Sequence, residues 1–123
     1  MAEELTIDGS ILNTIKKKLG VSPEDDSFDV DITMSINTAF ERLETLGLGP
    51  DGGFRITDAT TEWSSYTTDD MMIESVKDYI FMKVRLIFDS ASMSSFLIDS
   101  YKKQIDELEF LYICKSDKRK INN

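Results

Sequence analysis

The sequence contains no histidine and only one cysteine, Cys114, in 123 residues. A single cysteine excludes an intrachain disulfide, and the usual zinc sites built from histidine and cysteine are excluded as well. Without an imidazole, acid–base catalysis at neutral pH falls to Asp, Glu, Lys or Tyr. Cys114 has no histidine to activate it, so we expect it to be a small core residue near the end of the last helix.

Long apolar runs are missing too. No stretch approaches the roughly 18 apolar residues of a membrane span, and residues 1–10 have neither the basic start nor the apolar core of a signal peptide. We therefore expect a soluble protein that is not exported by a standard signal and does not engage a membrane. At 41% hydrophobic residues, the chain is long enough for one compact domain.

Positive charge is scarce, with 14 Lys and Arg against 23 Asp and Glu, which gives a net charge of −9. Such a surface repels phosphate backbones and argues against tight binding of nucleic acid. The last nine residues are the exception, because they hold four cations against the single acid Asp117. These cations are Lys115, Lys118, Arg119 and Lys120. This basic tail is either a solubilising end or a segment that docks on an acidic neighbour.

Helical periodicity extends over nearly the whole chain and predicts four amphipathic helices. The first covers about residues 9–19, is capped by Asp8 or Ser10, and stops at Gly20. The second has two candidate starts, Ser22 with Pro23 at the first helical position, or Asp26 or Ser27 with Asp29 in the first turn. The later start is favoured, and the helix should run to Leu46.

The other two helices lie in the second half of the chain. The third begins after TTDD, residues 67–70, where Thr67 or Thr68 can cap it, and its broad apolar stripe predicts the central helix. The fourth follows DSASMSS and should fray near Lys115. Its apolar face is predicted to consist of Leu97, Tyr101, Ile105, Leu108 and Leu111.

Residues 47–66, the arm, separate the second and third helices and contain four of the six glycines. The FRIT stretch alternates apolar and polar residues, which favours a short strand or hairpin arm. Its aromatic residues, Phe54, Trp63 and Tyr66, either fold back over the core or anchor another protein. The predicted fold is thus all-α, with four main helices in a small bundle and a long extended arm between the second and third.

The arm begins with GLGPDGG, which matches the G-x-G-x-x-G pattern of phosphate-binding loops. A phosphate-binding loop of this kind needs a strand before it and a helix directly after it. Here a helix leads in, Pro50 lacks an N–H, and Asp51 would repel a phosphate. We therefore interpret Gly47 as a left-handed helix cap, followed by a Pro-Asp-Gly turn that includes Gly49 and Pro50.

The acidic clusters do not predict a metal site or a catalytic site either. DDSFDVD spaces its acids as a calcium loop does, but the sixth position is Val30 and the twelfth is Ile36, where glycine and glutamate belong. Glu74 and Asp78 lie one helical turn apart and are best interpreted as a solvated face. We predict no catalytic site, no metal site and no cofactor.

Several stretches together resemble the head–tail connector, or adaptor, proteins of tailed phages and prophages. They are ILNTIKKKLGV, SFDVDITMSINTAFERLETLGLGPDGGFRI, TEWSSY, ESVKDYIFMKVRLIFD and SSFLIDSYKKQIDELEF, and they span residues 11–110. The link DSASMSS lacks the proline that this family is expected to have there.

The resemblance implies a virion structural protein, assembled in the host cytoplasm, that forms a ring of usually twelve copies under the portal. Such a ring receives the stopper or tail-completion protein and lets DNA pass without specific binding. It implies a domain over residues 1–114, whose arm touches a neighbouring subunit or the stopper through Gly47, Gly49, Pro50, Phe54, Trp63 and Tyr66. The tail, residues 115–123, would reach the portal through Lys115, Lys118, Arg119 and Lys120.

Two other classes remain open from the residues alone. A small acidic helical module of the bacterial cytosol would use its acidic face to mimic nucleic acid or engage a basic partner. A carboxylate-based hydrolase that depends on a divalent ion is the third possibility.

Overall fold

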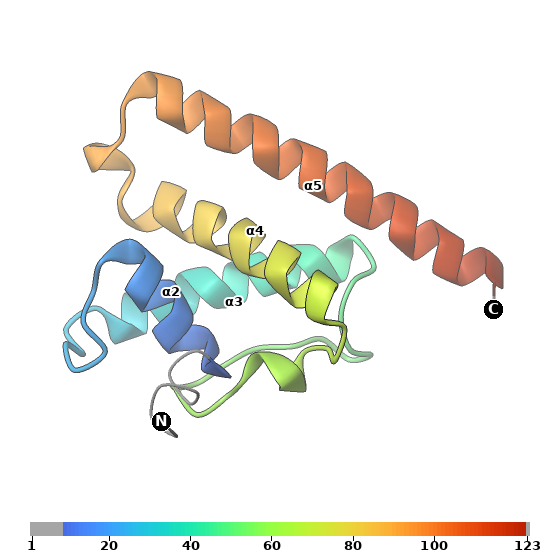
Figure 1. Ribbon diagram of the computed structural model, residues 1–123, viewed down its shortest axis with the longest axis horizontal. Coiled ribbons are helices and arrows are strands. Elements are labelled where there is room, and N and C mark those ends of the chain that lie inside the picture. The colour runs from blue at the N-terminus through green and yellow to red at the C-terminus, as the bar shows by residue number, and fades with distance from the viewer. Residues whose placement is uncertain (1–8, 123) are drawn as a thin grey trace.

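A computed structural model describes residues 9–122 of the chain, with side chains up to Asp117. Asp8, one of the two predicted caps of the first helix, lies outside the described residues. Four α-helices dominate, α2 (Ile11–Leu19), α3 (Asp29–Thr45), α4 (Asp70–Phe88) and α5 (Ser95–Asn122), with short 3-10 turns η1 (Trp63–Ser65) and η2 (Ser90–Ser92). Figure 1 shows α4 in the middle, between α5 and the α2/α3 pair. The predicted all-α fold of four packed helices is confirmed.

The first helix begins and ends where its residues predict. The Ser10 hydroxyl accepts a hydrogen bond from the Asn13 N–H at 3.2 Å, and Gly20 closes the helix at a φ of 84°. The second starts later than predicted, at Asp29, because the Asp25 carboxylate accepts a hydrogen bond from the Ser27 N–H and holds that segment in turns.

Lys16 fixes these turns against α2. It is buried, although it lies in the basic last turn of the helix, and its ammonium donates to the backbone oxygens of Pro23, at 3.1 Å, and Asp25, at 2.8 Å. The same Nζ lies 2.7 Å from a carboxylate oxygen of Asp29. A buried ammonium needs such partners, so this side chain ties the end of α2 to the start of α3.

The core forms where α2, α3 and the arm meet α4, the helix predicted to be central. Its best-buried members come from all four segments: Ile11, Ile15, Ile32, Ile36, Phe40, Leu43, Ile56, Val76, Tyr79 and Ile80. Because α4 contacts α2, α3 and α5, its broad apolar stripe is buried on more than one side.

The arm lies against this body, and its predicted strand is wrong, since no strand is formed within residues 9–122. The predicted alternation of buried and exposed side chains is correct, because Ile56 is buried while Arg55 and Thr57 are exposed. The Asn37 side chain takes the place of a neighbouring strand: its Oδ1 accepts from the Ile56 N–H and its Nδ2 donates to the Ile56 carbonyl, each at 2.8 Å.

Two predicted helix ends are also corrected. The cap of α4 is Asp69 rather than either threonine, because its carboxylate accepts from the N–H groups of Met71, at 3.1 Å, and Met72, at 3.2 Å. The fourth helix is capped by Ser94, whose hydroxyl accepts from the Leu97 N–H. It does not fray near Lys115 but continues as regular helix to Asn122.

The inner face of α5 differs from the prediction near its end. Leu111, expected in the core, is 44% exposed, whereas the neighbouring Tyr112 is completely buried. Cys114, also expected in the core, is exposed. One residue rotates a helix by about 100°, so burying Tyr112 turns both of these side chains outward.

Candidate interaction surfaces

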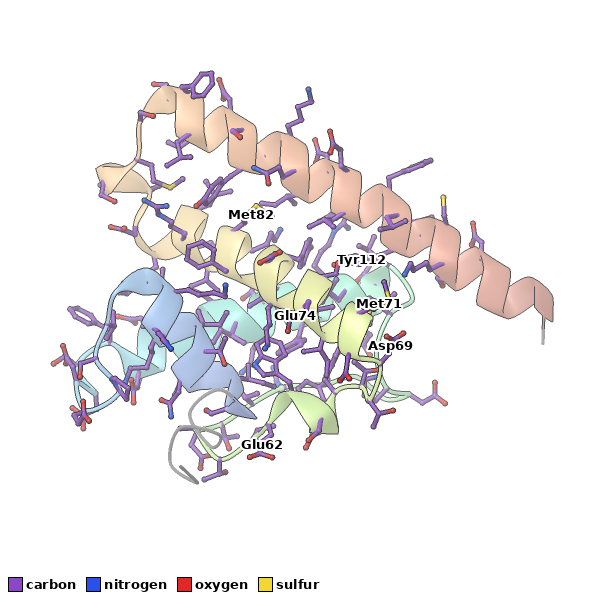
Figure 2. All side chains as sticks on the ribbon, in the orientation of Figure 1. Glu62, Asp69, Met71, Glu74, Met82 and Tyr112 are labelled. Atoms are coloured by element: carbon purple, nitrogen blue, oxygen red, sulfur yellow. The ribbon has the colours of Figure 1, made fainter. Side chains whose placement is uncertain are left out.

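Acidic side chains gather around η1 and the start of α4. Figure 2 shows Glu62, Asp69 and Glu74 on this part of the molecule. All three are exposed, and so is Asp70 in the first turn of α4. Carboxylates near a helix N-terminus complement its dipole, so local structure explains Asp69 and Asp70. Together with Glu62 and Glu74 they make this face anionic.

These carboxylates do not converge on one point. Among residues 9–122, no group of three or more Cys, Asp or Glu side chains is arranged to hold a metal ion. Glu74 instead pairs with Lys77 at 3.1 Å. The arrangement offers an electrostatic surface rather than a reaction centre.

The arm residues predicted to contact partners divide into two groups. Trp63 and Tyr66 are buried, at 3% and 6% exposure, and Phe54 is half-buried. All three rings pack on Phe40 of α3, with centroid distances between 4.9 and 6.4 Å. The Trp63 Nε1–H also donates to the Thr14 hydroxyl at 3.1 Å. The aromatics therefore fold back over the core, which is one of the two predicted alternatives.

Gly47, Gly49 and Pro50 form the turn at the other end of the arm. Gly47 and Gly49 have φ values of 93° and 100°, in the left-handed region that favours glycine. The Gly53 N–H donates to the Pro50 carbonyl at 3.2 Å, which confirms the predicted helix cap and Pro-Asp-Gly turn. Asp51 and Gly52 at the tip are exposed, so the accessible part of this turn is polar.

A polar cluster joins α5 to the rest of the bundle. The Tyr79 hydroxyl donates to Glu109 at 2.7 Å, and Arg42 Nη2 of α3 lies 3.0 Å from the same carboxylate. Burial, and then the neighbouring Glu109, raise the pKa of Tyr79 well above its usual range. Burial alone would raise the pKa of Glu109 as well, but hydrogen bonds from Arg42 and Tyr79 outweigh it and lower that pKa. Tyr79 thus stays a donor and Glu109 an acceptor at neutral pH.

Tyr112 supplies a second tie between α4 and α5. Figure 2 shows its side chain between the two helices. Its hydroxyl lies 2.6 Å from the Ser75 hydroxyl, and its ring meets the Tyr79 ring edge to face at 5.7 Å. Burial raises the pKa of Tyr112. Sequence reasoning did not single out Tyr112, since the neighbouring Leu111 fits the same periodic pattern.

Beside these ties, a groove of about 600 Å³ separates α4 from α5. Its apolar wall includes Phe81, Met82 and Leu108, and Leu111 lies at its edge. Asp78 and Glu107 add negative charge to its rim. The hollow is open on one side, as expected of a helix held to the bundle by a few strong contacts.

The outward face of α5 carries exposed apolar residues, which is unusual for the solvent side of a helix. Phe96 is at its start, and Phe110 and Ile113 are near its end. Lys115 is exposed in the same final part. Lys118, Arg119 and Lys120 belong to α5, but their side chains lie outside the described ones, so the role predicted for these four cations stays a prediction.

Comparison with known proteins gives one finding for nearly the whole chain. The family model described as "Phage connector protein" matches residues 11–118. Neither a curated protein nor a solved structure matches. The matched range begins at the first residue of α2 and includes α3, α4, the arm and most of α5. No helix within residues 9–122 is long and apolar enough to cross a membrane.

Proposed function

This chain belongs to the phage connector protein family, whose members are structural, and from this premise we propose that it forms a ring between portal and tail. Membership itself implies association with other head–tail components of the virion. In the proposal, copies of the chain, usually twelve, assemble under the portal of the DNA-filled capsid. The ring then receives the stopper or tail-completion protein. The single observation that carries the proposal is the family match over residues 11–118.

The charge of the chain supports passage of DNA through such a ring. The net charge of −9 and the anionic face around Glu62, Asp69 and Glu74 repel a phosphate backbone. A channel wall that attracted phosphates would hold the genome by many weak contacts at once. We place this anionic face towards the channel, where low affinity for DNA lets it slide.

The arm is proposed to touch a neighbouring subunit or the stopper. Because Trp63 and Tyr66 are buried, they act by fixing the arm on the body, and the exposed polar tip at Asp51 and Gly52 makes the contact. Gly49 links the two parts of the arm, because a Cβ at this position would come within 3.0 Å of the ring of the buried Tyr66. The turn and the buried aromatics therefore depend on each other.

The basic tail is proposed to reach the portal. Residues 115–123 hold four cations and one acid at the end of an otherwise acidic chain. Opposite charge between two surfaces favours encounter and fixes orientation. The end of α5 projects from the bundle in Figure 1, so it can enter an acidic site on another protein.

The test uses a tail of normal length without its positive charge. The variant replaces Lys115, Lys118, Arg119 and Lys120 with Gln, and it is compared with the wild type in a pull-down on cognate portal rings. The matched control is Lys102→Gln with Lys103→Gln, two exposed lysines earlier on α5.

The proposal expects capture by the portal to be lost in the tail variant and kept in the control, with normal helical circular dichroism in both. Undiminished capture of the tail variant would refute the assignment of the tail. Absence of capture even for the wild-type chain, under conditions where the portal is intact, would contradict the proposed function itself.

A further inference from the structure

The outward side of α5 has a seven-residue pattern centred on Phe110. Phe96, Lys103, Phe110 and Asp117 follow one another at intervals of seven residues, so they lie nearly in one line along the helix. All four are exposed, whereas Tyr112, on the opposite side, is completely buried. Figure 1 shows α5 at the outer edge of the bundle, so this line faces no other helix of the same chain. We call the line the α5 outer stripe.

Apolar side chains surround the middle of the stripe. Phe110 is 69% exposed, and Ile113 is 41% exposed. Cys114 is exposed as well, and the i+3 and i+4 positions of these two residues put them beside Phe110. Large apolar side chains grouped on the solvent side of a helix mark a contact surface. We therefore expect another protein surface to cover the α5 outer stripe.

The charges of the stripe indicate which surface covers it. Lys103 precedes Phe110 by seven residues and Asp117 follows it by seven, so opposite charges lie at equal distances from the apolar centre. Neither of the two forms an ion pair within the described part of the chain. A second α5 that runs antiparallel, with Phe110 opposite Phe110, would place each Lys103 opposite Asp117 of the other copy. The stripe is thus complementary in charge to itself.

We propose that the free protein forms a two-fold dimer in which the outer stripes of two α5 helices pack antiparallel around Phe110. The two Phe110 rings meet at the two-fold axis, and Ile113 and Cys114 enlarge this apolar centre. One pair of Lys103 and Asp117 lies on each side of it. The stripe from Lys103 to Asp117 is about 21 Å long, so the contact is small and the dimer should dissociate on dilution.

A parallel pair of helices would bring like charges together. It would place Lys103, Asp106 and Asp117 each against the same residue of the other copy, which is unfavourable. In the antiparallel pair, Asp106 and Glu107 instead lie across from residues 113–114 of the other helix, and each remains one turn from Lys103 of its own. The antiparallel orientation is therefore the one that the charges favour.

This dimer goes beyond the proposed ring. A two-fold contact uses the same surface on both copies and closes at two, whereas a ring uses two different surfaces of each copy. The dimer is therefore a form of the free protein, and it covers Phe110 until the chain is recruited to the portal. Lys115 lies about 140° around the helix from Phe110, so the contact leaves it accessible.

Engineered cysteines test the antiparallel register. The native thiol is first removed by Cys114→Ser, at an exposed position. In this background, Phe110→Cys, Lys103→Cys, Asp117→Cys and the double variant Lys103→Cys with Asp117→Cys are oxidised mildly at equal concentration and separated on non-reducing gels. The thiols of Phe110→Cys meet at the two-fold axis. Those of Lys103→Cys lie on opposite sides of it, about 21 Å apart along the helices, which is too far for a disulfide.

We expect Phe110→Cys to form covalent dimers at least about tenfold faster than Lys103→Cys or Asp117→Cys, because docked thiols have a high effective concentration. The double variant should also cross-link rapidly, since residue 103 lies opposite residue 117. It should stop at dimers, because both of its disulfides join the same two chains. Equal rates for Phe110→Cys and Lys103→Cys would overturn the proposed register.

Sedimentation over a range of concentrations measures the dimer without a cross-link. The wild type should show a monomer–dimer equilibrium, and Phe110→Glu should raise its dissociation constant at least about tenfold, because two like charges then meet at the axis. The matched control is Phe96→Glu. Phe96 is 84% exposed, and the residue that would lie opposite it lies beyond the end of the chain, so the dissociation constant should not change. Normal helical circular dichroism in both variants shows that the fold is intact.

A wild type that stays monomeric throughout its soluble range would overturn the dimer, and so would equal dissociation constants for Phe110→Glu and Phe96→Glu. The proposed function is read separately, by capture of the wild type on portal rings. Capture of a monomeric wild type would remove the dimer and leave the connector role, whereas a dimer that portal rings do not capture would do the reverse.

Discussion

Replacing Trp63 with Ala should strongly destabilise the isolated protein, because this side chain is part of the core. It is 3% exposed, packs on Phe40 and donates a hydrogen bond to Thr14. Truncating a buried Trp to Ala typically costs about 3–5 kcal/mol. A domain of this size has a total stability of about 5–15 kcal/mol, so the loss is a large fraction of the whole.

The expected shift in melting temperature follows from the chain length. An unfolding entropy of about 2.1 cal/mol/K per residue gives about 0.26 kcal/mol/K for the whole chain, so 4 kcal/mol lowers the melting temperature by about 15 °C. Trp63→Phe keeps an aromatic ring but removes the hydrogen bond, and should cost about 1–2 kcal/mol.

The assay is urea unfolding followed by far-ultraviolet circular dichroism, with Phe96→Ala as the control. Phe96 is 84% exposed, so its removal should change stability by less than about 0.5 kcal/mol. A Trp63→Ala protein with normal helix content that loses under about 1 kcal/mol would refute the core assignment. The alternative, that Trp63 anchors another protein, would then regain its support.

Three further predictions concern the ties between helices. Gly47→Ala should cost more than Gly20→Ala, because both glycines have positive φ but only at Gly47 would a Cβ collide with the Ser116 side chain. Urea unfolding should give a loss of about 1 kcal/mol from backbone strain in Gly20→Ala and a larger loss in Gly47→Ala. Lys16→Met should lose about 2–3 kcal/mol in the same assay, since it leaves Asp29 and two backbone oxygens without their cation. Glu109→Gln should lose about 1–2 kcal/mol at pH 7. Folding lowers the pKa of Glu109, so the stability that this carboxylate contributes is present above its unfolded pKa of 4.5 and is lost as the pH falls through the folded pKa. The difference in unfolding free energy between Glu109→Gln and the wild type should therefore shrink in acid. A constant difference from pH 7 to pH 3 would contradict this assignment.

Helix number and most helix ends could be predicted, because each depends on a local signal. Ser10 and Gly20 cap α2 as expected, and Gly47 takes the predicted left-handed conformation after α3. These residues act on backbone groups within a few positions of themselves. The sequence nearby therefore contains the information needed.

Features that depend on long-range contacts could not be predicted. Nothing in FRIT reveals that the Asn37 side chain will pair with Ile56, nineteen residues away. The choice between Leu111 and Tyr112 for the inner face of α5 depends on the hydroxyl of Ser75 on another helix. From the sequence, Lys16 is expected on the surface, but the carbonyl oxygens of Pro23 and Asp25 in the loop after α2 accept hydrogen bonds from its ammonium.

The candidate surfaces also include some features that the sequence predicts and others that depend on long-range packing. Composition alone indicated an acidic body and a basic tail, and the family resemblance is confirmed by the match over residues 11–118. Burial of Trp63 and Tyr66 and exposure of Cys114 required the structure, because each depends on the rotation of one segment against its neighbour.

Electron microscopy of the wild-type chain mixed with its cognate portal shows whether this chain is a structural subunit that joins portal to tail. Portal particles should gain a ring of added density on the side facing the tail, with an open channel along the axis. Portal particles that stay bare, at concentrations well above those of assembly in the cell, would contradict it.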